Sequence, residues 1–142
     1  MGLMATIFTR IIDGDIPGTF VWRDDECVAF MSINPMAHGH TLVVPRAEID
    51  HWVDCPADLS RHLFDVSYEI GRAQQAAFGC ERVGLIIAGY EVPHTHIHVL
   101  PTTDMSQLSF ANAAGHVDRD SLESAAEAIR SALRAAGRSE VV

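Results

Sequence analysis

The sequence predicts a single domain of the α+β class, built on a five-stranded antiparallel sheet with one long helix, a short N-terminal helix and an added C-terminal helix. The 142 residues, of which 48% are hydrophobic and 20% charged, suit one globular core. Five short runs rich in β-branched and apolar residues are bounded by turn residues, which is typical of strands. Because only one long helical pattern interrupts these runs, the sheet is expected to be antiparallel.

The N-terminal part predicts a short helix followed by three strands. The helix covers residues 6–13 and ends at Gly14, where a turn begins. Strands are expected over residues 20–23, 27–33 and 40–44; the first two form a hairpin, and the second is expected to be half buried. A proline directly after the third strand is expected to stop it.

The middle of the chain carries the clearest helical pattern, over residues 56–78. A proline stands in its first turn and Gly79 just past its end, positions where these residues are favoured. Its apolar stripe follows spacings of three and four residues: Leu59, Leu63, Val66, Ile70, Ala73 and Ala77. A fourth strand is expected over residues 83–88, and a fifth over residues 93–101.

The C-terminal part predicts a polar loop and a final helix. Leu108 and Phe110, in the loop after the fifth strand, are expected to pack against the body of the domain. The helix is expected from about residue 121 to 136, with one apolar stripe facing the core. Asp120 and Glu123 indicate a capping box at its start.

Composition argues against several functions. The net charge of −9 argues against binding a nucleic acid polymer, which requires a basic surface. The three cysteines form no Cys-x-x-Cys pair and are expected to be free thiols in a reducing compartment. No apolar run is as long as a membrane span and the start is no signal peptide, so we expect a cytoplasmic protein without a membrane partner. Gly2 and Thr6 fit a loose myristoylation pattern, which we interpret as a chance match.

The most unusual segment is a row of three alternating histidines, His94, His96 and His98. Alternate residues of a strand point to the same face, so the three imidazoles are expected on one face, roughly 7 Å apart, opposite Ile97 and Val99. A face of this kind is expected to be accessible because a helix covers only the other side of the sheet. We therefore expect the chemistry of the protein to occur there.

Three interpretations of this row are open. As a metal site, at most two of the three imidazoles could share one ion, with help from another ligand, because the outer pair is too far apart. As a covalent catalyst, one neutral imidazole attacks phosphorus while its neighbours bind the phosphate. The third interpretation, polar residues on a solvated face, is favoured for His51, His62 and His116 but not for the row.

Three motifs together resemble the histidine triad (HIT) superfamily, and within it a Hint-like bacterial branch. Residues 94–100 are similar to its His-φ-His-φ-His-φ-φ signature, where φ is apolar, with Thr95 in the first φ position. Residues 39–45 are similar to its Gly-His-φ-φ-φ-φ-Pro strand, and residues 7–17 to its N-terminal segment. The resemblance covers a core of about residues 5–101, so that residues 102–142 form an added loop and helix within one domain over residues 1–142.

The resemblance implies a nucleotide-binding hydrolase or nucleotidyl transferase that cleaves at an α-phosphate. His96 would be the nucleophile and form a covalent nucleotidyl-histidine. His98 would contact the phosphate, His94 would orient the site, and His40 would add a fourth imidazole. The partner implied is a nucleoside monophosphate or nucleotide conjugate, no cofactor is expected, and the protein is expected to be a homodimer in which two sheets continue into one of ten strands.

The resemblance also assigns nucleotide-binding positions. An apolar clamp for the base corresponds to Phe8, Ile11, Phe30 and Ile33, which are expected to be buried whether they serve as clamp or as core. Ser32 stands where an aspartate would bind the ribose hydroxyls, and the loop before the triad contributes Gly89 and Glu91. Members that bind a structural zinc use ligands at three positions that are Thr6, Thr9 and Glu48 here, so no metal is expected.

Glu91 replaces a hydroxyl-bearing residue close to the phosphate. A carboxylate repels phosphate unless it is neutralised or paired with a cation. This favours a nucleoside phosphoramidate or a related conjugate, whose leaving amine would meet Glu91 as a positive charge. The alternative is a nucleotide-binding sensor or interaction module with weak or no catalysis.

Overall fold

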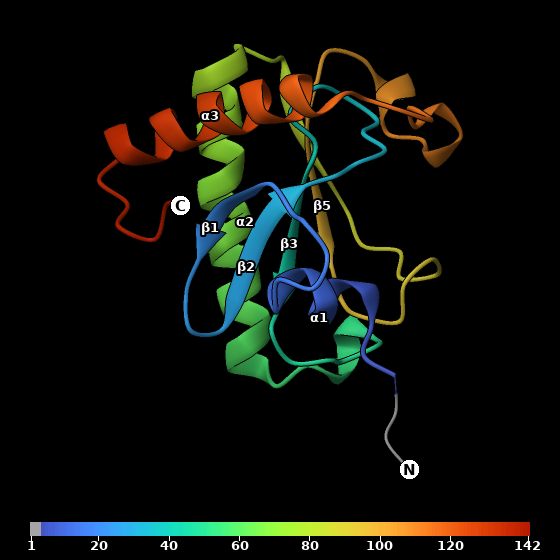
Figure 1. Cartoon of the computed structure of the whole chain (residues 1–142). Helices are drawn as coiled ribbons and strands as arrows, with labels where there is room; N and C mark the ends of the chain where they lie inside the picture. The colour runs from blue at the N-terminus through green and yellow to red at the C-terminus, as the bar shows by residue number, and fades with distance from the viewer. Residues whose placement is uncertain (1–3) are drawn as a thin grey trace.

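The structure, a computed structural model, describes residues 4–142. Gly2 of the myristoylation pattern lies outside the described residues. Five strands form one sheet in the order β1-β2-β3-β5-β4, and every neighbouring pair is antiparallel (Figure 1). The strands are β1 (Phe20–Arg23), β2 (Cys27–Met31), β3 (Thr41–Pro45), β4 (Arg82–Ile86) and β5 (Ile97–Thr102). The predicted fold class is confirmed.

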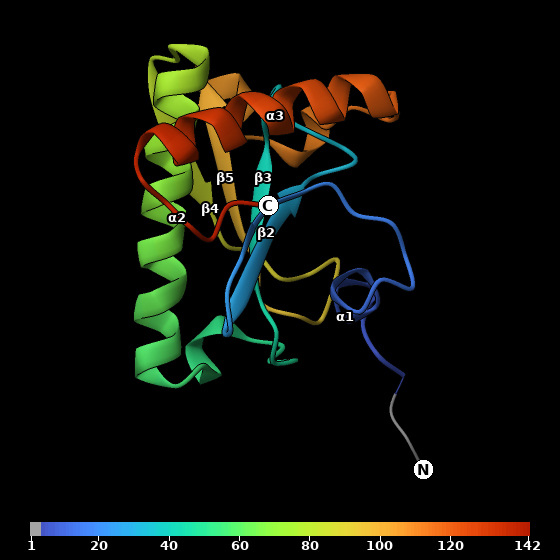
Figure 2. The same ribbon diagram turned by 60° about the vertical axis from the view of Figure 1, so that its left-hand side comes forward.

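Helices cover both faces of the sheet. The long α2 (Ala57–Phe78) lies against one face, α3 (Arg119–Ala135) runs across α2, and the short α1 (Ile7–Ile12) lies on the opposite side (Figure 2). The main core is formed by apolar residues of β1, β2, β3, β5, α2 and α3, including Val43, Ile70, Val99 and Ile129. A second cluster, on the α1 side, contains Phe8, Phe20, Val28, Phe30, Leu42 and Val44.

Because helices and apolar side chains cover both faces of the sheet, two predictions need correction. The strand β2 is buried along its whole length instead of half buried, and it ends at Met31, two residues before the predicted end. The face opposite α2 is not an open surface, because α1 and the second apolar cluster cover part of it. Pro45, which was expected to follow β3, is the last residue of that strand and pairs with Cys27.

The start of α3 differs from the prediction. The helix begins at Arg119, and the side chain of Asp118 accepts a hydrogen bond from the Ser121 N–H at 2.8 Å. The predicted capping box of Asp120 and Glu123 is therefore wrong, because an acidic residue two positions earlier caps the helix. Phe110 and Leu108 do fold back: Leu108 packs so closely over Gly84 that a side chain there would collide with it.

The two edges of the sheet differ. On the β1 edge, Trp22 bridges Val141, and the Arg23 N–H donates to the Glu140 carbonyl at 2.9 Å. The other edge is β4, and within residues 4–142 no strand pairs with its outer side. None of the helices in the same range is long and apolar enough to cross a membrane.

Candidate active site

The three histidines of the row lie on the α1 side of the sheet, at and just before the start of β5. Ordered β5 pairing begins only at Ile97, so His94 and His96 precede the strand, and the predicted strand over 93–101 starts too early. The rings of His96 and His98 are 4.9 Å apart between centroids, closer than a straight strand would hold them. His94, His96 and His98 are 0%, 2% and 6% exposed, respectively, so the row is buried and not solvated.

His94 is held from both ring nitrogens. Its Nε2 lies 2.7 Å from the Pro45 carbonyl oxygen, which can only accept, so Nε2 carries the proton. Its Nδ1 then accepts from the Thr6 hydroxyl, also at 2.7 Å. Burial is the main cause that lowers the pKa of His94, which favours this neutral form.

Thr6, Thr9 and Glu48 occupy the positions of the implied zinc ligands; Thr6 contacts His94, and the other two contact Thr6. Thr6 Oγ1 accepts from the Thr9 N–H at 3.1 Å and thereby caps α1, while the Thr6 N–H donates to Glu48 Oε1 at 2.7 Å. Hydrogen bonds from the Thr9 side chain and the Thr6 N–H lower the pKa of Glu48. Hydrogen bonds therefore join α1 to the histidine segment at this point.

His96 is fixed in the tautomer that leaves Nε2 with a free electron pair. Its Nδ1 is 2.6 Å from the carbonyl oxygen of His94, so Nδ1 must be the donor. The edge of the Phe8 ring packs against it, with ring centroids 4.9 Å apart. Glu91 Oε2 is 3.9 Å from Nε2, and the Glu91 side chain is about half exposed, at 50%.

A chain of hydrogen bonds also sets the tautomer of His98. The Met36 N–H donates to His40 Nδ1 at 3.1 Å, so His40 must donate from Nε2, to His98 Nδ1 at 2.9 Å. The proton of His98 is therefore on Nε2, which has no hydrogen-bond partner among residues 4–142 although it is buried. A buried N–H without a partner is costly unless a ligand accepts from it.

Burial keeps His40 and His98 neutral at pH 7. For His40, burial and the neighbouring His98 and His96 lower the pKa to about 3. For His98, burial and the nearby His96 lower the pKa to about 4, although Glu91 opposes the shift.

One residue at the site was not identified from the sequence as a site residue. The ring of Phe110 packs edge-on against His98, with centroids 5.1 Å apart, and is 43% exposed. It comes from the loop after β5, outside the motifs of the resemblance. The sequence predicts that Phe110 packs against the domain, because it is an aromatic residue in a largely polar loop, but it does not indicate contact with His98.

The candidate base clamp is only partly as predicted. Phe8 and Phe30 are buried and in contact, with ring centroids 5.6 Å apart, and Ile11 packs half-buried beside them. Ile33 is 68% exposed, so the prediction that it is buried is wrong. The reason is that β2 ends before it, and Ile33 lies in the turn that follows.

Ser32 and the loop before the triad complete the set of predicted site residues. The Ser32 hydroxyl accepts from the Asn34 N–H at 3.3 Å, and the Ser32 N–H donates to the His40 carbonyl at 3.0 Å, which ties this turn to His40. Gly89 has a positive φ of 86°, a conformation that favours glycine. A pocket of about 390 Å³ is lined by His96, Thr95, Asp50, His51, Trp52 and residues 87–90.

Donor atoms of Glu91, His96 and His98 lie within 4.8 Å of one another, close enough to consider a metal ion. Ligation would require a free electron pair on His98 Nε2. The hydrogen bond from Met36 through His40 instead keeps a proton on that nitrogen. The arrangement therefore favours an anion at His98 over a cation.

Much of this chain is similar in sequence to known proteins. The sequence model of the HIT domain matches residues 13–105. The protein named hit of Bacillus subtilis is 35% identical over 102 residues, covering 67% of this chain and 69% of the relative. The adenylylsulfatase HINT3 of Arabidopsis thaliana is 29% identical over 100 residues, covering 67% of this chain and 51% of the relative.

A solved structure agrees over nearly the whole chain. The zinc-bound histidine triad family protein from Mycobacterium smegmatis superposes with a TM-score of 0.82 at 27% identity, covering 96% of this chain and 98% of that one. The agreement includes both the sheet and the C-terminal helix, which the motifs alone did not cover. This chain belongs to the HIT domain family.

Proposed function

We propose that this protein is a nucleotide-binding hydrolase that cleaves a nucleoside phosphoramidate, or a related nucleotide conjugate, at the α-phosphate through a covalent nucleotidyl-His96. The observation that carries the proposal is that the neighbouring rings of His96 and His98 are held in opposite tautomers. His96 offers an electron pair on Nε2, and beside it His98 offers an unpartnered N–H. One ring can attack phosphorus while the other donates to a phosphoryl oxygen.

The reaction has two steps. The electron pair of His96 Nε2 attacks the α-phosphorus, the P–N bond to the amine breaks, and the amine leaves with a proton from solvent. The imidazole of the intermediate carries positive charge, which the His94 carbonyl stabilises because it accepts from Nδ1. Water then attacks phosphorus and loses a proton to solvent; this releases the nucleoside monophosphate and returns the electron pair to Nε2, so the scheme uses no cofactor.

Glu91 supports an amine leaving group. Its carboxylate is 3.9 Å from His96 Nε2, close to where the bond breaks. A carboxylate attracts the ammonium that forms and repels an anionic leaving group. Because the side chain is half exposed, it can turn aside when the phosphate enters. The name of one relative, an adenylylsulfatase, supports a nucleotide conjugate as the general substrate class.

The nucleoside end of the substrate would lie on the apolar side of the row. Phe8 contacts both His94 and His96, and Phe30 and Ile11 pack behind it. We assign the base to this cluster, with Ile33 exposed at its rim and Ser32 and Gly89 close to the sugar and phosphate. Phe110 covers His98 from the other direction.

The proposal includes a homodimer joined at the β4 edge. Within residues 4–142, this edge has no partner strand, and apolar side chains of α2 and β4 are exposed. Tyr68 is 61%, Phe64 39% and Leu85 48% exposed. Pairing of two β4 strands would bury such side chains and satisfy the backbone groups of the edge.

The test compares wild type with His96→Asn, which is similar in size, on an adenosine phosphoramidate. We expect turnover in wild type, at least about a thousandfold less in the variant, and a nucleotidyl adduct on His96 in quenched reactions. Unchanged secondary structure and nucleotide affinity in the variant would exclude misfolding as the cause. Equal turnover would refute the proposal.

The hydrolysis assay, together with calorimetry, also tests the alternative that the protein is a nucleotide-binding module without catalysis. If calorimetry shows that wild type binds adenosine or guanosine monophosphate but hydrolyses no conjugate from a panel with amine, phosphate and sulfate leaving groups, the protein is a binding module. The altered loop with Tyr90, 97% exposed, and Glu91 is the observation that favours this alternative. Hydrolysis of any member of the panel through His96 would reject it.

A further inference from the structure

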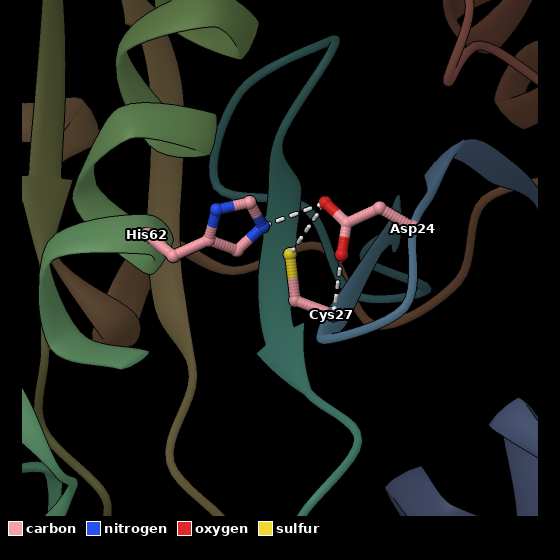
Figure 3. Close-up of side chains that lie close together, drawn as sticks. All are labelled: Asp24, Cys27 and His62. Carbon is pink, nitrogen blue, oxygen red and sulfur yellow. Dashed lines mark hydrogen bonds and ion pairs between the residues drawn. The ribbon is translucent and has the colours of Figure 1, made fainter. Parts of the chain in front are cut away.

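A second cluster of ligand-type side chains lies on the opposite side of the sheet from the histidine row. Asp24 is in the turn between β1 and β2, Cys27 begins β2, and His62 projects from α2 (Figure 3). One donor atom from each lies within 4.8 Å of the other two. No sequence motif groups these residues, because β3 and the connection that follows it lie between Cys27 and His62.

The donor set suits a zinc-type cation. Thiolate, imidazole and carboxylate are the three side-chain ligands that zinc takes, with bonds of about 2.0 Å to nitrogen and oxygen and about 2.3 Å to sulfur. Around a tetrahedral ion such bonds separate the donors by roughly 3.2–3.5 Å. Cys27 Sγ is 3.6 Å from Asp24 Oδ2, close to that separation, and His62 Nε2 is 2.7 Å from the same oxygen. The His62–Asp24 pair would need to open by only about 0.5 Å as the ion replaces the shared proton.

The supporting contacts of a metal site are present as well. The Trp22 Nε1–H donates to Asp24 Oδ2 at 2.8 Å, and the N–H groups of Glu26 and Cys27 donate to Oδ1, also at 2.8 Å each. These bonds fix the carboxylate in one orientation. His62 Nδ1, the nitrogen facing away from Asp24, is 3.6 Å from Glu26 Oε2. A carboxylate hydrogen-bonded to the second nitrogen is the common support for a metal-binding imidazole, and Glu26 stands at that nitrogen at an ion-pair distance that is longer than a hydrogen bond.

The charges around the cluster favour a cation. Asp24 and Glu26 are the acidic groups that face it, and Arg46, whose Nε donates to the Asp24 carbonyl, is the basic one. Burial opposes ionisation of Asp24, but hydrogen bonds from Trp22, Cys27, Glu26 and His62 lower its pKa to about 2. Burial and the charge of Asp24 raise the pKa of the Cys27 thiol, so binding of an ion has to displace the thiol proton.

We propose that Asp24, Cys27 and His62 form a binding site for one Zn²⁺-like divalent cation, separate from the histidine row. The side chains of Asp24 and His62 are 16% and 30% exposed, which gives the ion a path in and leaves the fourth position to water. The ion would join the β1–β2 turn to α2. The positions of Thr6, Thr9 and Glu48, on the α1 side, are not involved.

The test uses Co²⁺ as a probe of the purified whole chain, because a thiolate bound to Co²⁺ gives a charge-transfer absorption. The histidine row contains no thiol, so the band cannot come from that row, and its loss in Cys27→Ser distinguishes the new site from Cys55 and Cys80. We expect a band that saturates near one ion per chain, and Zn²⁺ should abolish it by competition. His62→Gln, a change at a half-buried position of α2, should weaken Co²⁺ binding at least tenfold, and Cys27→Ser should remove the band.

Two matched variants complete the design. Cys80→Ser removes another buried thiol, and His51→Gln another exposed histidine, and both should leave the band unchanged. Cys27 is buried in the main core, so the result with His62→Gln decides the test if Cys27→Ser does not fold. No band in wild type, or equal Co²⁺ affinity in His62→Gln, would overturn the proposal and leave the cluster as a hydrogen-bonded contact. Neither readout depends on nucleotide hydrolysis.

Discussion

His40 Nε2 lies 2.9 Å from His98 Nδ1, and this bond decides which nitrogen of His98 carries the proton. The tautomer of His40 is itself set by a backbone group, because the Met36 N–H donates to His40 Nδ1. Two residues that never need to touch the substrate thus determine that His98 presents a donor. The first prediction follows from this relationship.

Replacing His40 by alanine should lower kcat by roughly 10–100-fold with little change in KM, because His98 loses its fixed tautomer but keeps its place. His98→Ala, which removes the donor itself, should cost about 100–1000-fold. Steady-state kinetics on the phosphoramidate measure both, and His116→Ala, an exposed histidine, is the control. A wild-type kcat in His40→Ala would show that His40 does not control the tautomer that His98 uses in catalysis.

The stability of the protein should fall as the pH decreases from 7 to 5. In the unfolded chain both histidines titrate near 6.5, whereas in the folded protein their pKa values are about 3 for His40 and about 4 for His98. Between these values the unfolded state binds more protons, so the free energy of unfolding rises with pH. Each histidine should contribute up to about 2 kcal/mol to the difference between pH 5 and pH 7.

Urea unfolding at the two pH values checks this. In His40→Gln the difference between pH 7 and pH 5 should shrink by about 2 kcal/mol, whatever the absolute stability of the variant. An unchanged difference would mean that His40 already titrates normally in the folded protein.

Thr6→Val should destabilise the protein by about 1–3 kcal/mol, because it removes both the cap of α1 and the donor to His94. Thr6→Ser keeps the hydroxyl and should recover most of the loss. Denaturant titration gives the values, with Thr19→Val as a control at a half-buried threonine. If serine and valine behave alike, the hydroxyl contributes nothing.

Glu91→Gln should change which leaving group is preferred. Without the carboxylate, the ratio of kcat/KM for an amine conjugate to that for an anionic leaving group should fall roughly tenfold, equivalent to about 1.4 kcal/mol. Asp50→Asn, at an exposed acid lining the neighbouring pocket, should leave the ratio unchanged. A constant ratio in Glu91→Gln would remove Glu91 from substrate selection.

Chelator treatment should leave hydrolysis unchanged. The reason is that His98 Nε2 is held protonated and His96 alone supplies the nucleophile. Assays before and after EDTA, with metal content measured on the same samples, provide the comparison. Loss of activity that Zn²⁺ restores would favour the metal interpretation of the Glu91–His96–His98 group.

Local pattern predicted the sheet well because strand alternation and helical spacing are short-range properties. Ile97 and Val99 face the α2 core, and His98 faces the other way, as alternation requires. The predicted ends of helices were less reliable where two similar residues could each cap the helix, as Asp118 and Asp120 could at the start of α3.

The tautomers could not be predicted from the sequence, because each depends on a partner brought in by tertiary structure. His94 meets Thr6, which is 88 residues away, and His98 meets His40, which is 58 residues away. The exposure of Ile33 likewise depends on where β2 stops pairing with β3. The cluster at His62 has the same origin, since α2 brings that ring to the β1–β2 turn.

The pairing of Glu140 and Val141 with β1 has a consequence for assembly. A sheet with two free edges can add copies at both ends and grow into a fibre. Here the final residues of the chain already fill the backbone hydrogen-bonding positions beside Trp22 and Arg23. A second copy that added to the sheet would then do so at β4, the edge without such a cover among the described residues, and a two-fold pair formed there would have the covered β1 edges at its ends.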